Sequence, residues 1–146
     1  MTRRRRSDAR IEQLARLEVF RGCPRKDLER AAALTYHTTL VAGSVLCRQG
    51  AFGRQAYVIV DGEAVVSVDG TPVAVVGPGA VVGEMSALDQ PWRSATVTAT
   101  TPMTVLVVAT HELNDLLHAS PVATRNVLVA LSARLRRTDA AVDVQV

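Results

Sequence analysis

The sequence predicts a mainly β domain with helices at both ends, and three observations carry this prediction. Short segments rich in β-branched and small apolar residues recur about every ten residues between positions 36 and 110, separated by glycine or proline. Short, evenly spaced strands of this kind are typical of an antiparallel sandwich, barrel or jelly roll. Apolar residues at helical spacing precede and follow this region. A chain of 146 residues is long enough for one such domain with a substantial core.

The segment before position 36 predicts two short helices. Ser7 and Asp8 give a capping signal, and the residues that follow them show apolar positions three and four apart. The same spacing returns after Pro24. We expect Phe20 to lie in the connection between the two helices.

Seven strands are expected in the central region. They cover residues 37–41, 44–48, 55–60, 64–68, 73–76, 94–100 and 103–109. The connections contain AG, QGAFG, DG, DG, GPG and TTP, in which Gly and Pro supply the backbone angles that tight turns require.

Two further helices are expected after position 109. Thr110 is a candidate cap for the first, and Ser120 precedes a proline at the first position of the second. The second helix carries an apolar seam at spacing i, i+3, i+7, for which core packing is favoured over a dimer contact; it comprises Leu128, Leu131 and Leu135. Residues 139–146 have no strong period and are expected to form a short tail.

Positive charge is concentrated at the N-terminus. The first ten residues carry a net charge of +4 and the remainder −1. A basic face that would bind nucleic acid is therefore not supported, and we expect residues 1–10 to be a flexible basic tail. Phosphates or anionic lipid are alternative contacts for this tail. Sixteen Arg against the single Lys26, with abundant Ala and Val, indicate a GC-rich bacterial source.

Several classes of function find no support in the sequence. Cys23 and Cys47 stand alone, so neither a zinc site nor a disulfide framework is indicated, and two such thiols fit a reducing cytosol. The three histidines, His37, His111 and His118, are too scattered for the metal set of a metalloenzyme, and GEMSA is not a nucleophile elbow. We expect no prosthetic group and no enzyme activity. Without a signal peptide or a long apolar run, the protein is expected to be soluble and cytoplasmic, with no membrane span.

The stretch GEMSALDQPWRSATVTAT places Glu84, Asp89 and Arg93 in a region that is otherwise almost uncharged. A short helix that begins at Gly83 would direct backbone N–H groups at an anion, and the planar guanidinium of Arg93 suits a phosphate. Glu84 would repel a bare phosphate but would accept a hydrogen bond from a ribose hydroxyl beside it. The alternative is a structural ion pair between Glu84 and Arg93 that closes a loop.

These residues resemble the phosphate-binding cassette of the cyclic nucleotide-binding domain family. The resemblance rests on Gly83-Glu84, on the nine-residue step to Arg93, and on Arg93-Ser94-Ala95-Thr96-Val97. It extends over residues 15–137 through FRGCPRKDLERAA and LCRQGAFGRQAYVIVDGEAVVSV. It implies a double-stranded β-helix, or jelly-roll β-barrel, with N- and C-terminal helices, a binding domain of residues 11–138 and a cassette of residues 83–97. Family members that are transcription factors continue into a helix-turn-helix, for which we expect no room after Arg137.

The resemblance also implies a role for each cassette residue. Glu84 would bind the ribose 2′-OH, and Arg93 would bind the cyclic phosphate. The other expected ligand-binding residues, which form the phosphate cradle or wall the pocket, are Val82, Gly83, Met85, Ser86, Ser94 and Ala95. Trp92 is expected either to cover the mouth of the pocket or to mark a partner surface.

The implied function is a non-enzymatic regulatory module that binds a 3′,5′-cyclic nucleotide, with cAMP favoured over cGMP. Movement of the C-terminal helices would pass the signal to a separate effector protein, and the last helix is a candidate homodimer contact. One alternative is a degenerate domain that serves as a protein-interaction scaffold without nucleotide. The other, DNA binding through the arginine tail alone, is less favoured.

Overall fold

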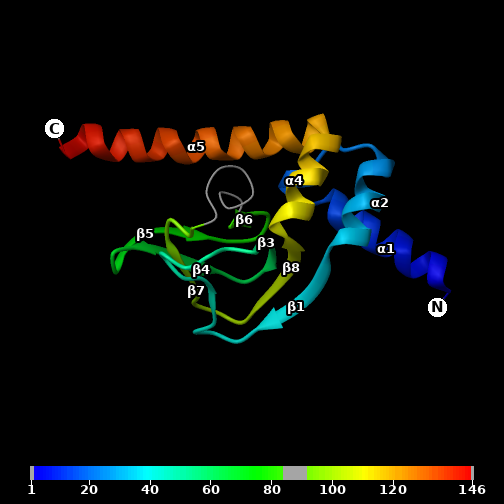
Figure 1. The fold of residues 1–146 in the computed structure, drawn as a ribbon, viewed down its shortest axis with the longest axis horizontal. Helices are drawn as coiled ribbons and strands as arrows, with labels where there is room; N and C mark the ends of the chain where they lie inside the picture. The colour runs from blue at the N-terminus through cyan, green and yellow to red at the C-terminus, as the bar shows by residue number, and fades with distance from the viewer. Residues whose placement is uncertain (1, 84–91, 146) are drawn as a thin grey trace.

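The computed structural model describes residues 2–83 and 92–145, with side chains described as far as Arg136 (Figure 1). Its helices are α1 (Arg3–Ala15), the 3-10 helix η1 (Glu18–Phe20), α2 (Arg25–Leu34), α4 (Thr110–Ala119) and α5 (Pro121–Gln145). Its strands are β1 (Tyr36–Leu40), β2 (Val45–Cys47), β3 (Gln55–Asp61), β4 (Ala64–Val68), β5 (Thr71–Val76), β6 (Val81–Val82), β7 (Thr96–Ala99) and β8 (Met103–Ala109).

The strands form two sheets in which every strand pairing is antiparallel. One sheet has the order β1-β8-β3-β6, and the other has the order β2-β7-β4-β5. Neighbours in a sheet are often distant in the chain, as for β1 and β8, because the two sheets are wound together. The predicted antiparallel jelly roll with flanking helices is confirmed.

Alternation along β3 divides the interior into two cores. Ala56 and Val58 face the helices, whereas Tyr57 and Ile59 face the space between the two sheets. β8 alternates in the same way, and its residues are buried on both faces. A strand covered on both sides is expected to be almost continuously apolar, as the sequence MTVLVVA is.

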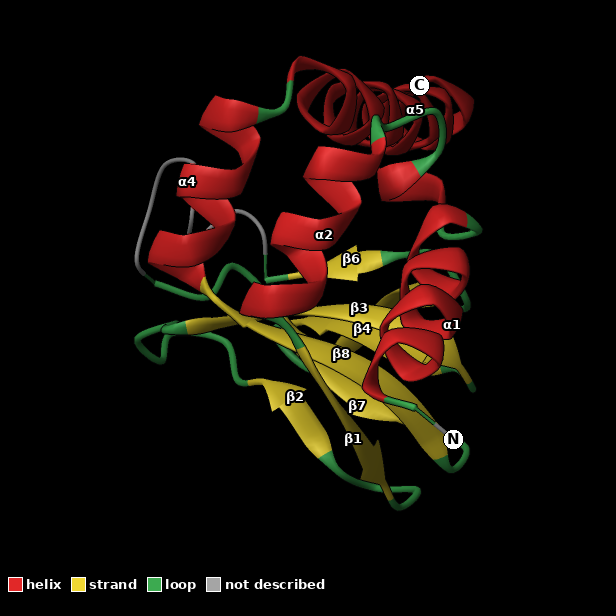
Figure 2. Ribbon diagram, turned by 90° about the vertical axis from the view of Figure 1, so that its right-hand side faces the viewer, coloured by secondary structure: helices red, strands yellow, loops and turns green. Residues whose placement is uncertain are grey.

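The helices lie together on one side of the strands (Figure 2). Leu14 of α1 and Leu116 of α4 are almost completely buried and belong to the core between the helices and the sheet that contains β3 and β8. Burial of each such side chain contributes about 1.5–3 kcal/mol. α5 runs across the roll, and the two termini lie at opposite ends of the long axis (Figure 1).

At the α4–α5 junction, the start of α5 is as the sequence predicts. The Ser120 hydroxyl accepts a 3.2 Å hydrogen bond from the Ala123 backbone N–H, and Pro121 is the first residue of α5. The predicted cap at Thr110 is wrong. Thr110 is itself the first residue of α4, and its hydroxyl donates to the carbonyl oxygen of Arg54 at 3.2 Å.

Three further predictions need correction. α1 begins at Arg3, with Thr2 rather than Ser7 as its N-cap, so the helix includes most of the segment expected as a tail. α5 continues to Gln145, through the expected C-terminal tail. β6 lies between the strands expected at residues 73–76 and 94–100, where no strand is predicted, and it pairs with Tyr57 and Val58 of β3.

The leucine seam of α5 does not pack into the core as a unit. Leu128 and Leu135 are 59% and 62% exposed, whereas Leu131 packs against the helical core. The buried stripe is instead Ala123, Val127 and Leu131, at spacing i, i+4, i+8. In the described part of the chain, no helix is both long enough and apolar enough to span a membrane.

Candidate functional site

The structure brings Gly83 and Arg93 together at the end of β6. One guanidinium nitrogen of Arg93 donates a 3.3 Å hydrogen bond to the carbonyl oxygen of Gly83. A second donates to the carbonyl oxygen of Gln55, the first residue of β3. Arg93 is only 9% exposed, so these carbonyl groups help to hold a cation that has largely left water.

Gly83 is required for this close approach. Its φ angle is +85°, a conformation that favours glycine. A Cβ atom at this position would overlap the guanidinium of Arg93 and would lie 3.0 Å from the carbonyl oxygen of Gln55. Because Gly83 has no side chain, a guanidinium or a ligand can contact its backbone more closely than it could at any other residue type.

The backbone of Arg93 is fixed by the connection between β2 and β3. The Arg93 N–H donates to the carbonyl oxygen of Ala51 at 2.8 Å, and the Arg93 carbonyl accepts from the Gly50 N–H at 2.9 Å. Phe52 and Trp92 form an isolated antiparallel β-bridge beside these bonds. The QGAFG segment is thus more than a turn, because it pairs with the chain that leads to Arg93.

Tyr57 lies near the candidate site, although the cassette motif does not indicate it. It is half-buried between the two sheets and lies opposite Val82 in the pairing of β3 with β6. Burial is the main cause that raises the pKa of the Tyr57 phenol above 10, with the nearby Cys47 acting in the same direction and the positive charge of Arg93 opposing it. The phenol therefore stays neutral near pH 7. Side chains alternate between the two faces of a strand, so the position of Tyr57 within QAYVIV is the signal that could place it on the face between the two sheets.

The predicted site residues fall into three groups. Gly83 and Arg93 are in contact, and Val82 is buried in the core between the sheets. Ser94 is exposed and Ala95 is half-buried, in the short segment between Arg93 and β7. Glu84, Met85, Ser86 and Asp89 lie outside the described residues, as does the expected short helix.

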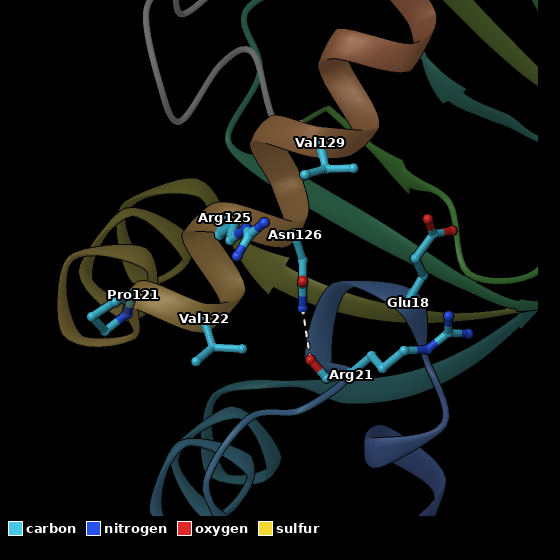
Figure 3. A pocket seen from close by; sticks show the side chains of 7 residues that line it. All are labelled: Glu18, Arg21, Pro121, Val122, Arg125, Asn126 and Val129. Carbon is cyan, nitrogen blue, oxygen red and sulfur yellow. Dashed lines mark hydrogen bonds between the residues drawn. The ribbon is translucent and has the colours of Figure 1, made fainter.

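A separate pocket of about 560 Å³ lies between η1 and the first half of α5 (Figure 3). The amide nitrogen of Asn126 donates to the carbonyl oxygens of Val19 and Arg21 at 3.0 and 2.9 Å, which ties α5 to η1. The residues that line it are Glu18, Arg21, Pro121, Val122, Arg125, Asn126 and Val129, none of which belongs to the predicted cassette. Within the described residues, no three His, Cys, Asp or Glu side chains are grouped so that they could hold a metal ion.

Comparison with known proteins shows which family the chain resembles. A family model described as "Cyclic nucleotide-binding domain" matches residues 37–120. The mouse cyclic nucleotide-gated channel alpha-4 is 36% identical over 81 residues, which cover 54% of this chain and 14% of the channel. The cyclic AMP receptor protein of Thermus thermophilus is 25% identical over 131 residues, which cover 86% of this chain and 61% of that protein. The chain therefore spans less than two thirds of either relative.

The solved structure of the Thermus thermophilus catabolite activator protein has the same fold. It superposes with a TM-score of 0.73 at 26% identity, over 87% of this chain and 62% of that one. The family match covers more than half of the chain and includes the strands that position Gly83 and Arg93. The chain belongs to the cyclic nucleotide-binding domain family.

Proposed function

We propose that this domain binds a 3′,5′-cyclic nucleotide and carries out no chemistry on it. The observation that carries the proposal is the contact of the largely buried Arg93 guanidinium with the backbone at Gly83. Arginine presents a planar set of donors that suits phosphate, and carbonyl acceptors hold these donors in a fixed orientation. A cyclic phosphate carries one negative charge, which this cation would neutralise.

Each cassette residue has a proposed role. Arg93 binds the cyclic phosphate, with backbone groups of Gly83, Met85, Ser86, Ser94 and Ala95 as further donors. Glu84 accepts a hydrogen bond from the ribose 2′-OH. Val82 and Tyr57 form part of the pocket wall, since both face the space between the sheets.

The expected ligand is cAMP rather than cGMP. The support for this choice is the similarity over 86% of the chain to a protein named for cyclic AMP. The choice of base would depend on contacts beyond the phosphate and ribose, because these two groups are common to both nucleotides.

The proposed output is a movement of α5. The Arg134 guanidinium of α5 donates a 2.8 Å hydrogen bond to the carbonyl oxygen of Val81, two residues before Gly83. A ligand bound at Gly83 would shift the position of α5 if this contact differs between the free and bound states. The effector is a separate protein or a further domain. The proposed binding domain is residues 11–138, which begin within α1 and end within α5. A bacterial source, from the composition, and a cytoplasmic location, from the isolated cysteines, are parts of the same proposal.

A second candidate function is a protein-interaction domain that binds no nucleotide. The observation that favours it is the exposure of three apolar side chains on α5, Leu128, Val129 and Leu135. In this candidate function these residues contact a protein partner or a second copy, and the domain binds no nucleotide.

Isothermal titration calorimetry with cAMP, cGMP and 5′-AMP distinguishes the two candidates. We expect saturable binding of cAMP, weaker binding of cGMP, and little binding of 5′-AMP, whose phosphate is not cyclic. A Gly83→Ala variant should lose cAMP binding, because the new Cβ would displace the Arg93 guanidinium. Absence of heat with both cyclic nucleotides, in a protein shown to be folded by circular dichroism, would reject the proposed function and favour the interaction domain.

A further inference from the structure

Two exposed aromatic side chains meet beside the proposed phosphate site. Phe52 and Trp92 are 55% and 57% exposed. Their ring centroids lie 5.5 Å apart and their planes are at 88°, which is the edge-to-face arrangement that aromatic pairs prefer. The chain has only two Phe, two Tyr and one Trp, so this contact uses two of its few aromatic residues.

The aromatic contact joins two segments that are 40 residues apart in the chain. Phe52 belongs to the connection between β2 and β3, and Trp92 is the residue immediately before Arg93. The backbone hydrogen bonds of Arg93 with Gly50 and Ala51 lie next to the Phe52–Trp92 β-bridge. Any displacement of one segment from the other would therefore move the backbone of Arg93.

The same connection also controls the far end of the arginine side chain. Gln55, three residues after Phe52, supplies one of the carbonyl oxygens that accept from the Arg93 guanidinium. Between them, the guanidinium carbon of Arg54 lies 5.5 Å from the centroid of the Phe52 ring. Both the backbone and the guanidinium of Arg93 thus depend on where residues 50–55 lie.

We propose that the edge-to-face contact of Phe52 with Trp92 positions Arg93 for the cyclic phosphate, which makes Phe52 and Trp92 positioning residues of the site. This inference rests on the proposed function. A ligand binds more weakly when the competent arrangement of its site is only partly populated. Fixing the β2–β3 connection against the residue before Arg93 keeps that arrangement populated before ligand arrives. The aromatic pair therefore contributes to affinity without touching the nucleotide.

The test is the dissociation constant of cAMP for aromatic variants of the full chain. Trp92→Ala and Phe52→Ala should each raise it about fivefold, from the typical contribution of an aromatic pair. Trp92→Phe, which keeps an aromatic ring, should stay within about twofold of wild type. Val41→Ala, at a side chain that is 75% exposed in the turn after β1, is the control and should not change affinity.

Two readouts separate positioning from a general loss of stability. The increase in the dissociation constant should be the same for cAMP and cGMP, because the aromatic pair acts through the arginine that binds their common phosphate. In an Arg93→Lys background, adding Trp92→Ala should raise the dissociation constant by less than about 1.5-fold, since residues that act through one another are not additive. Both measurements are made at a temperature where circular dichroism shows every variant to be folded.

The outcomes distinguish this inference from the proposed function. If wild-type protein binds neither cyclic nucleotide, the proposed function fails and this inference fails with it. If wild type binds but Trp92→Ala and Phe52→Ala bind equally well, only the inference is overturned. A full fivefold effect of Trp92→Ala in the Arg93→Lys background would overturn it as well, because the aromatic pair would then act independently of Arg93.

Discussion

The Ser120 hydroxyl donates a 2.8 Å hydrogen bond to a carboxylate oxygen of Asp27, and both residues are buried. Ser120 lies between α4 and α5, and Asp27 lies in the first turn of α2. The Sγ atom of Cys23 is 3.8 Å from the same hydroxyl. One side chain thus caps α5 and ties the α4–α5 junction to the N-terminal helices, which places α5 for any movement that follows ligand binding.

Ser120→Ala should destabilise the domain by about 2 kcal/mol, because it removes the α5 cap and a donor to the buried Asp27 carboxylate. Urea denaturation followed by circular dichroism measures this loss. Ser132→Ala is the matched control, since Ser132 is exposed on the same helix, and it should change stability by less than about 0.5 kcal/mol. Equal effects of the two substitutions would contradict the role assigned to Ser120.

Gly62→Ala should destabilise the fold far more than Gly70→Ala. Both glycines have positive φ angles, +93° and +79°. A Cβ at position 62 would lie 2.9 Å from the Cα atom of Met103 and closer still to the carbonyl oxygen of Pro102, whereas one at position 70 would meet nothing within 4 Å.

We expect a loss of about 3 kcal/mol or more for Gly62→Ala. Gly70→Ala has only the backbone strain, about 1–2 kcal/mol. The free energies of unfolding of the two variants, measured side by side, check this difference. Similar values would show that the chain at Pro102 and Met103 can move away from position 62 at little cost.

Much of the fold could be predicted because its signals are local. The Asp69-Gly70 pair between β4 and β5 has two positive φ angles, as a two-residue hairpin turn requires, and the DG sequence indicates such a turn directly. β6 escaped prediction because a strand of two residues has no alternation to detect. Its pairing with β3 depends on the winding of the whole roll.

The faces of α5 could not be predicted for a similar reason. Residues at spacing i, i+3, i+7 and residues at spacing i, i+4, i+8 can each form one side of a helix. Leu131 belongs to both sets. Packing of α5 against η1 and α4 buries Ala123 and Val127 and leaves Leu128 exposed. Larger side chains do not by themselves identify the buried face.

In the candidate site too, local sequence signals could be interpreted and long-range contacts could not. The cassette motif led to Gly83 and Arg93, which the structure brings into contact. The support that Arg93 receives from residues 50–55 comes from a pairing between distant segments, and no spacing within the sequence indicates it. Tyr57 lay within reach of strand alternation, but its neighbour Val82 is on the strand that the sequence did not reveal.

Folding stability should depend on His37 below neutral pH. Although the His37 side chain is largely exposed, partial desolvation of its ring, together with the positive charge of Arg10, lowers its pKa below 6.5 in the folded chain. The unfolded chain therefore binds a proton more readily there, so stability falls as the pH drops below about 6.5 and rises again as it increases. His37→Gln removes this contribution.

The free energies of unfolding of wild type and His37→Gln, measured from pH 7.5 down to pH 5, check this sign. As the pH falls, the free energy of unfolding of wild type should decrease relative to that of His37→Gln. A difference that stays constant, or that moves in favour of wild type, would contradict the direction assigned to the His37 pKa.

The proposed binding of a cyclic nucleotide's phosphate by Arg93 is tested by calorimetric titration of cAMP into wild type, Arg93→Ala and Arg30→Ala. Arg30 is an exposed arginine of α2 and serves as the control for loss of one positive charge. Loss of a buried, charge-assisted contact should weaken binding by about 30-fold or more in Arg93→Ala. Arg30→Ala should bind as wild type does. Equally tight binding of cAMP by Arg93→Ala and wild type would show that Arg93 does not bind the phosphate.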